Sequence, residues 1–149
     1  MARETTYESW VKQEGIPVVE GYGVEDVRRI SRQPWARTGG KGAFIQLKGM
    51  EGFTGMYVGE VLPGGALNPE RHIYEELIYI LEGVGSTEVW PNGGSKKKVQ
   101  FEWQAGSLFA VPLNSWHRLI NGSRERAVYL AVTSAPLMMD LLHDADFVF

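Results

Sequence analysis

The chain has 149 residues, the length of one ordinary domain, and its net charge of −3 argues against a nucleic-acid partner, because phosphate binding requires a basic surface. The absence of cysteine excludes disulfides, zinc–thiolate sites and thiol nucleophiles, so any metal must be bound through nitrogen and oxygen. No apolar run approaches the roughly 20 residues of a membrane span and the charged first residues lack a signal-peptide core, so we expect a cytoplasmic protein without membrane association.

The first 35 residues predict one short helix. Residues 6–14 place Tyr7, Trp10 and Val11 on one helical face, and the following Gly15 ends the pattern. Residues 24–31 fit either a turn of helix or an extended arm.

From residue 42 onward the pattern indicates β-structure. Short apolar runs alternate with Gly, Pro or Asn clusters at roughly the 8–12-residue spacing that is typical of a sandwich or barrel. The predicted strands are 43–49, 55–62, 77–83, 86–90, 98–103, 107–112, 116–122 and 126–134. Turn signals fall at 47–53 and at 91–94, where Asn-Gly tolerates positive φ. Residues 136–149 have apolar residues at helical spacing and predict one last helix.

One segment, residues 68–83, looks locally like a helix. Asn68 suits the N-cap, Pro69 the first helical position and Glu70 the first turn, and Gly83 suits the position after the end. Taken alone, the segment favours a helix. Whether this segment is a helix or contains a strand depends on residues further along the chain.

Two segments hold glycines, histidines and carboxylates at fixed spacing. The first runs Gly64, five residues, Glu70, Arg71, His72, three residues, Glu76, six residues and Gly83. The second runs Gly106, five residues, Pro112, Leu113, Asn114, two residues, His117, three residues and Asn121. Together they resemble the paired motifs of the cupin superfamily, with two departures. Glu70 stands where the family usually has its first histidine, and Asn114 replaces a glycine, which is a mild change because Asn tolerates a left-handed turn.

The resemblance implies an all-β fold. It implies an antiparallel jelly-roll (cupin) β-barrel with short N- and C-terminal helical segments. We expect an N-terminal arm or short helix over 1–35, the barrel over 36–135 and a C-terminal helix over 136–149. Residues 77–83 would then form a strand, against the local helical signals, and their unbroken apolar run would suit a buried strand.

The resemblance also implies a metal centre. One divalent ion would be held by His72, Glu76 and His117, with Glu70 as a fourth ligand or as a general base near the metal. Such a mixed nitrogen and oxygen set suits Fe(II) or Mn(II) first, with Ni(II) or Zn(II) as alternatives. Structural histidines in a filled barrel are the competing interpretation. Trp116 and Arg118, which flank His117, are expected to point out of the barrel.

Three functions remain open from the sequence. The leading one is a metal-dependent oxidoreductase of dioxygenase type that acts on a small organic molecule. The second is a metal-assisted isomerase, lyase or hydrolase that uses Glu70 for proton transfer, and the third is a non-catalytic module that binds a small molecule. Since cupins are commonly dimers, the resemblance also implies a homodimer, with Tyr7, Trp10 and the apolar C-terminal segment as candidate contacts.

Overall fold

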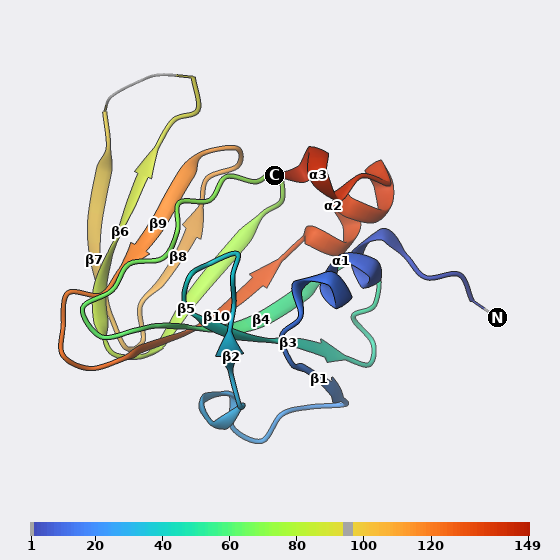
Figure 1. Ribbon diagram of the computed structural model, residues 1–149, viewed down its shortest axis with the longest axis horizontal. Coiled ribbons are helices and arrows are strands. Elements are labelled where there is room, and N and C mark those ends of the chain that lie inside the picture. The colour runs from blue at the N-terminus through green and yellow to red at the C-terminus, as the bar shows by residue number, and fades with distance from the viewer. Residues whose placement is uncertain (1, 94–96) are drawn as a thin grey trace.

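A computed structural model describes residues 2–93 and 97–149, and most of its regular structure is β-strand (Figure 1). The strands are β1 (Val18–Gly21), β2 (Gln33–Pro34), β3 (Lys41–Leu47), β4 (Gly55–Val61), β5 (Glu76–Glu82), β6 (Val84–Trp90), β7 (Val99–Gln104), β8 (Leu108–Val111), β9 (Trp116–Ile120) and β10 (Ala127–Thr133). The helices are α1 (Thr6–Glu14), α2 (Ala135–Leu142) and α3 (Ala145–Val148), with one 3₁₀ turn at Val27–Arg29.

The strands form two sheets that enclose a shared core. The large sheet has the order β1-β3-β4-β10-β5-β8, with β2 paired to β3, and the small sheet has the order β7-β6-β9. Buried side chains of both sheets join in one cluster, which includes Phe44 and Ile78 from the large sheet and Trp103 and Leu119 from the small one. The three helices gather on the side of the molecule away from β6 and β7 (Figure 1). The all-β prediction with short terminal helices is therefore confirmed.

The strand prediction for 77–83 is confirmed, and the helix that the local signals of 68–83 favoured does not form. β5 pairs antiparallel with β10 on one side and with β8 on the other, so that Ile78 lies opposite both Ala131 and Phe109. These hydrogen-bonding partners lie far along the chain. Pairing with them outweighs a helical preference that rests on capping residues alone.

The apolar run of β5 is not buried on both faces, which corrects the sequence interpretation. Ile78 and Ile80 point into the barrel and are almost fully buried. Leu77 and Tyr79 alternate to the outer face and are exposed. The strand therefore follows the two-residue period of a sheet with one covered face, although its outer side chains are apolar.

Helix α1 spans the predicted residues, but its aromatic face packs on its own chain. Tyr7 and Trp10 are each 7% exposed, and the Trp10 ring lies 5.4 Å from that of Phe44 and 5.6 Å from that of Phe149. The barrel end and the C-terminal segment of the same chain cover Tyr7 and Trp10, and their part in a dimer contact stays a prediction. β1 also joins the large sheet, in parallel pairing with β3.

The predicted turns and the predicted C-terminal helix can also be compared with the structure. The turn predicted at 47–53 connects β3 and β4, whereas the turn predicted at 91–94 lies partly outside the described residues. The prediction of a single C-terminal helix is wrong. α2 and α3 are separate helices, because His143 adopts a left-handed conformation with φ of 56°.

No helix within residues 2–93 and 97–149 is long and apolar enough to cross a membrane.

Since Trp10 is part of the core, Trp10→Ala should destabilise the protein by about 3–5 kcal/mol, the usual cost of removing a buried aromatic side chain. The exposed Tyr22 provides the control, and Tyr22→Ala should change the free energy of unfolding by no more than about 0.5 kcal/mol. Urea denaturation followed by tryptophan fluorescence or circular dichroism measures both. Equal stability of the two variants would show that α1 packs only loosely on the barrel.

Candidate metal centre

The two sequence motifs are tied together through their main chains. The N–H of Glu70 donates to the carbonyl of His117 and the N–H of His117 donates to the carbonyl of Glu70, both at 2.9 Å. Nearby, the N–H of Leu67 donates to the carbonyl of Leu119 at 2.9 Å. The segment before β5 therefore runs beside β9 without forming a regular strand, and it holds the side chains of residues 70 and 72 against that of residue 117.

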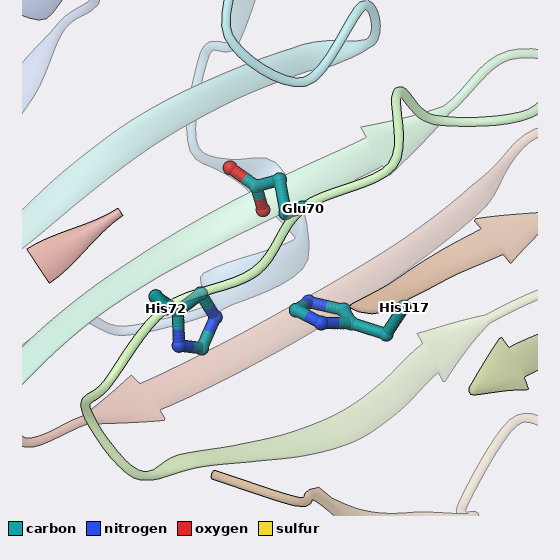
Figure 2. Close-up of side chains that lie close together, drawn as sticks. All are labelled: Glu70, His72 and His117. Atoms are coloured by element: carbon teal, nitrogen blue, oxygen red, sulfur yellow. The ribbon is translucent and has the colours of Figure 1, made fainter. Parts of the chain in front are cut away.

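Glu70, His72 and His117 form a compact cluster of possible ligands. Each offers one ligand atom, and these atoms all lie within 4.8 Å of one another. Figure 2 shows Glu70 and His72 projecting from one segment and His117 reaching toward them from the facing strand. His72 and His117 are 1% and 3% exposed, whereas Glu70 is half-buried. The more open approach to the cluster therefore lies on the Glu70 side.

Glu76, the first residue of β5, contacts both histidines. Its Oε2 lies 2.8 Å from Nε2 of His72 and 3.7 Å from Nε2 of His117. The structure thus brings all four sequence-predicted site residues to one place. The group of mutually close ligand atoms, however, consists of the other three.

Tyr57 on β4 fixes the Glu76 carboxylate. The Tyr57 hydroxyl donates to Oε1 of Glu76 at 2.5 Å, and the Tyr57 ring meets that of Tyr129 edge-on at 5.9 Å. Gly59 permits this arrangement, because a Cβ at that position would lie 2.3 Å from the Tyr129 ring. No sequence motif indicates Tyr57 as part of the site. Its hydrogen bond could not be predicted, since it depends on how two distant strands are placed in the sheet.

Main-chain carbonyls and ring stacking orient the two imidazoles. Nδ1 of His72 lies 3.1 Å from the carbonyl of Tyr74, and the two rings stack at 3.7 Å. Nδ1 of His117 lies 3.4 Å from the carbonyl of Ser115. For His117, donation from Nδ1 would leave the lone pair of Nε2 for another partner such as a metal. Nε2 of His72 lies 2.8 Å from the Glu76 carboxylate, so it would have to release a proton to bind a metal.

The charges inside the cluster alter the pKa values of its members. Burial, together with the charge of Glu76, raises the pKa of Glu70 to about 7. Burial is also the largest influence on Glu76 and would raise its pKa, but the contacts with His72, His117 and Tyr57 outweigh it and lower that pKa. For His72, burial acts to lower the pKa, but the hydrogen bond to Glu76 and the nearby carboxylates raise it above the ordinary value. Burial lowers the pKa of His117.

The donor set fits a divalent metal ion. Nε2 of His117 lies 3.7 Å from Oε2 of Glu76, beyond hydrogen-bond distance, and the ligand atoms of Glu70, His72 and His117 face one another within 4.8 Å. An ion between the imidazoles and carboxylates would bind these atoms and reduce the repulsion between Glu70 and Glu76. Two imidazoles with one or two carboxylates suit Fe(II), Mn(II), Ni(II) or Zn(II).

Other motif residues have structural roles. Asn114 adopts φ of 61°, the left-handed conformation that its replacement of glycine predicts. The Asn121 side chain is fully buried and donates to the carbonyls of Val61 and Glu125, so it fastens the turn after β9.

Side chains that flank His117 point outward, as expected. Trp116 stacks on Trp90 with 6.3 Å between ring centroids, and Nε of Arg118 donates to Glu88 at 2.8 Å. Both pairs lie on the outer face of the small sheet. Several inward side chains of the strands belong to the core: Tyr57, Ile78, Ile80 and Leu119 are buried within it, and Phe109 packs against it.

Comparison with known proteins agrees with this geometry. The cupin domain model matches residues 57–133, about half of the chain, and the chain therefore belongs to the cupin superfamily. No curated protein matches it.

Solved structures share the fold at low identity. The oxalate decarboxylase of Lactobacillus farciminis in complex with formate is 21% identical with a TM-score of 0.60, over 73% of this chain and 32% of that one. The protein plu4264 of Photorhabdus luminescens is 18% identical with a TM-score of 0.58, over 76% and 89%. The Cnp3 cupin domain of Schizosaccharomyces pombe is 17% identical with a TM-score of 0.56, over 73% and 66%. This chain thus spans about a third of the oxalate decarboxylase, and these likenesses support the jelly-roll barrel.

His117→Ala should weaken the binding of Mn(II) or Fe(II) at least about tenfold, because it removes one imidazole and leaves a hole in the donor set. Isothermal titration calorimetry of the metal-free protein measures the affinity. His143→Ala is the control, since His143 is exposed at the end of α2. Unchanged affinity in His117→Ala would place the metal elsewhere.

Tyr57→Phe should also weaken metal binding, by about 10- to 100-fold, because Glu76 loses the hydrogen bond that orients its carboxylate. The same titration measures this effect. The matched control is Tyr22→Phe, which removes a hydroxyl from an exposed ring. If both variants bind metal like the parent, Tyr57 only fills space.

Proposed function

We propose that this cupin is a metal-dependent oxidoreductase of dioxygenase type that acts on a small organic molecule. The observation that carries the proposal is the convergence of two buried imidazoles and two carboxylates inside the barrel, with the more open approach on the Glu70 side. Mn(II) or Fe(II) is the proposed ion. Mn(II) has support from the likeness in fold to Bacillus subtilis oxalate decarboxylase, which contains Mn(II) centres and is 23% identical with a TM-score of 0.57.

The side chains divide into fixed and free groups. His72, held by stacking on Tyr74, and Glu76, held by Tyr57, would act as ligands whose positions are set before the ion arrives. His117 would supply the second imidazole from β9. A bound divalent ion would supply Lewis acidity and open coordination positions for small molecules.

Glu70 is more exposed than His72, Glu76 and His117. Within residues 2–93 and 97–149 its carboxylate makes no hydrogen bond or ion pair. It is therefore free either to complete the ligand set or to turn toward a substrate and take a proton from it.

This freedom favours a second candidate function, a metal-assisted lyase, isomerase or hydrolase in which Glu70 transfers the proton. The fold likeness to oxalate decarboxylases makes oxalate the first substrate to assay for either function. The difference between the two candidates lies in whether oxygen is consumed.

The experiment begins with elemental analysis of the purified protein. Protein loaded with Mn(II) or Fe(II) is then mixed with oxalate and a panel of small organic acids, while an oxygen electrode and product chromatography follow the reaction. Oxygen uptake that depends on both metal and substrate supports the oxidoreductase. Turnover without oxygen uptake supports the second candidate. Binding of an acid without turnover would instead support a non-catalytic module.

Substitutions at residue 70 distinguish a ligand from a base. If Glu70 is a ligand, Glu70→His should retain metal binding with a preference shifted toward Ni(II), Cu(II) or Zn(II), and Glu70→Gln should lose affinity. If Glu70 is a base, both variants should keep their affinity and lose about 10²- to 10⁴-fold in rate.

The control is Glu75→Gln, which neutralises an exposed carboxylate just before β5. Calorimetry gives the affinities and the product assay gives the rates. If the residue-70 variants behave like this control in affinity, metal preference and rate, Glu70 has no part in the site.

A further inference from the structure

A pocket with a basic lining lies on the outer face of the large sheet. Residues 28–32 form one wall, and residues at or next to the ends of β3, β4 and β10 form the rest. Its volume of about 410 Å³ is within the roughly 300–1,000 Å³ of small-molecule sites. We call it the basic pocket, after its charged lining residues Arg28, Arg29, Arg32, Lys41, Glu60 and Arg126.

The basic pocket and the candidate metal centre lie on opposite faces of β4. Tyr57, which supports the metal centre, belongs to the core between the two sheets. Val58 points the other way and packs in the outer cluster with Ile30, and Glu60, two residues further along the strand, shares that outer face. A ligand in the basic pocket would therefore not touch the metal centre.

A buried ion pair forms the floor of the basic pocket. The side chains of Arg32 and Glu60 are 5% and 8% exposed, and Nε and Nη2 of Arg32 donate to Oε1 of Glu60 at 3.1 and 2.8 Å. Nη1 of Arg32 donates to the carbonyls of Arg28 and Ile30 at 3.1 and 3.0 Å. Arg32 therefore neutralises Glu60 and also fixes the main chain that carries Arg28 and Arg29.

Strand register places further cations beside this ion pair. Lys41 lies opposite Glu60 on one side, and Val128 of β10 lies opposite Glu60 on the other. Arg126, two residues before Val128, donates to Glu82 at 3.3 Å. Within residues 2–93 and 97–149 the Lys41 ammonium makes no hydrogen bond or ion pair. It is therefore left to bind a ligand.

The charges of the basic pocket do not balance. Asp26 accepts from Arg28 at 3.0 Å and lies 3.8 Å from Arg29. In the part of the chain that the structure describes, the carboxylates paired with the five cations are Asp26, Glu60 and Glu82. Two positive charges therefore remain uncompensated, although the whole chain has a net charge of −3. A positive region of this kind attracts anions.

We propose that the basic pocket binds the phosphate group of a small molecule. A phosphate monoester carries a charge of about −1.5 to −2 near neutral pH, which matches the two uncompensated cations. Guanidinium groups bind phosphate oxygens in pairs, and an ammonium group adds a point charge. The volume of the pocket leaves room for the organic part of such a ligand. This assignment does not rest on the proposed metal-dependent activity.

Titration of the purified protein with inorganic phosphate and with pyrophosphate tests the proposal. Isothermal titration calorimetry at constant ionic strength, adjusted with chloride, should give a Kd for phosphate of about 1 mM or below, and tighter binding of pyrophosphate because of its additional charge. Added salt should weaken both. Backbone amide shifts of residues 28–32 and of Lys41 should move during the titration, which locates the ligand.

A double variant with Lys41→Met and Arg126→Met should weaken phosphate binding at least about tenfold, because it removes two charges and keeps apolar side chains of similar length. The matched control combines Lys12→Met with Arg3→Met, which removes the same charge from exposed residues in and next to α1. This control should bind phosphate like the parent. His117→Ala should also bind it like the parent, because the metal centre is not involved. A circular dichroism melt of each variant shows that it is folded.

Four results would overturn the proposal. One is the absence of heat and of amide shifts at about 10 mM phosphate, ten times the expected Kd. Another is parent-like affinity in the folded Lys41→Met and Arg126→Met variant. Equal loss in the control with Lys12→Met and Arg3→Met would show a general charge effect without a site. Loss of binding in His117→Ala would place the phosphate at the metal centre.

Discussion

The reciprocal main-chain hydrogen bonds between Glu70 and His117 are the constraint on which the candidate metal centre depends. They join a segment that is not a regular strand to β9, and so they bring residues from the two motifs to one point in the barrel. Because both bonds are between backbone groups, the side chains of Glu70 and His117 remain free for a ligand. Backbone groups therefore hold the two segments together, and the side chains of Glu70 and His117 are left to bind a ligand.

Inside the barrel, two aromatic side chains hold Glu76 and His72 in position. Tyr57 holds Glu76 through its hydroxyl, and Tyr74 holds His72 by stacking. The buried cluster around them excludes water and strengthens the electrostatic contacts among His72, Glu76 and His117. Among residues 2–93 and 97–149 no side chain supports the Glu70 carboxylate in this way, and this difference between the two carboxylates is the reason that its role differs from that of Glu76 in the proposed function.

The outer faces of the two sheets differ in the polarity of their exposed side chains. The small sheet exposes charged pairs such as Arg118 with Glu88, whereas the large sheet exposes apolar residues on β5 and β8. Residues 24–30 cover the part of the large sheet that includes Val58 on β4 and Val128 on β10.

The sequence by itself determined the features that depend on short-range rules. The span of α1, the strand segments and the left-handed turn at Asn114 follow from capping, periodicity and turn chemistry, and the motif spacing indicated Glu70, His72, Glu76 and His117. The motif spacing also predicted β5 as a strand against the local helical signals, although its partners β8 and β10 are distant in the chain. Only the tertiary structure decided the Tyr57–Glu76 bond, which joins residues 19 apart, and the outward direction of Leu77 and Tyr79. Each of these depends on strand register, which local preferences do not specify.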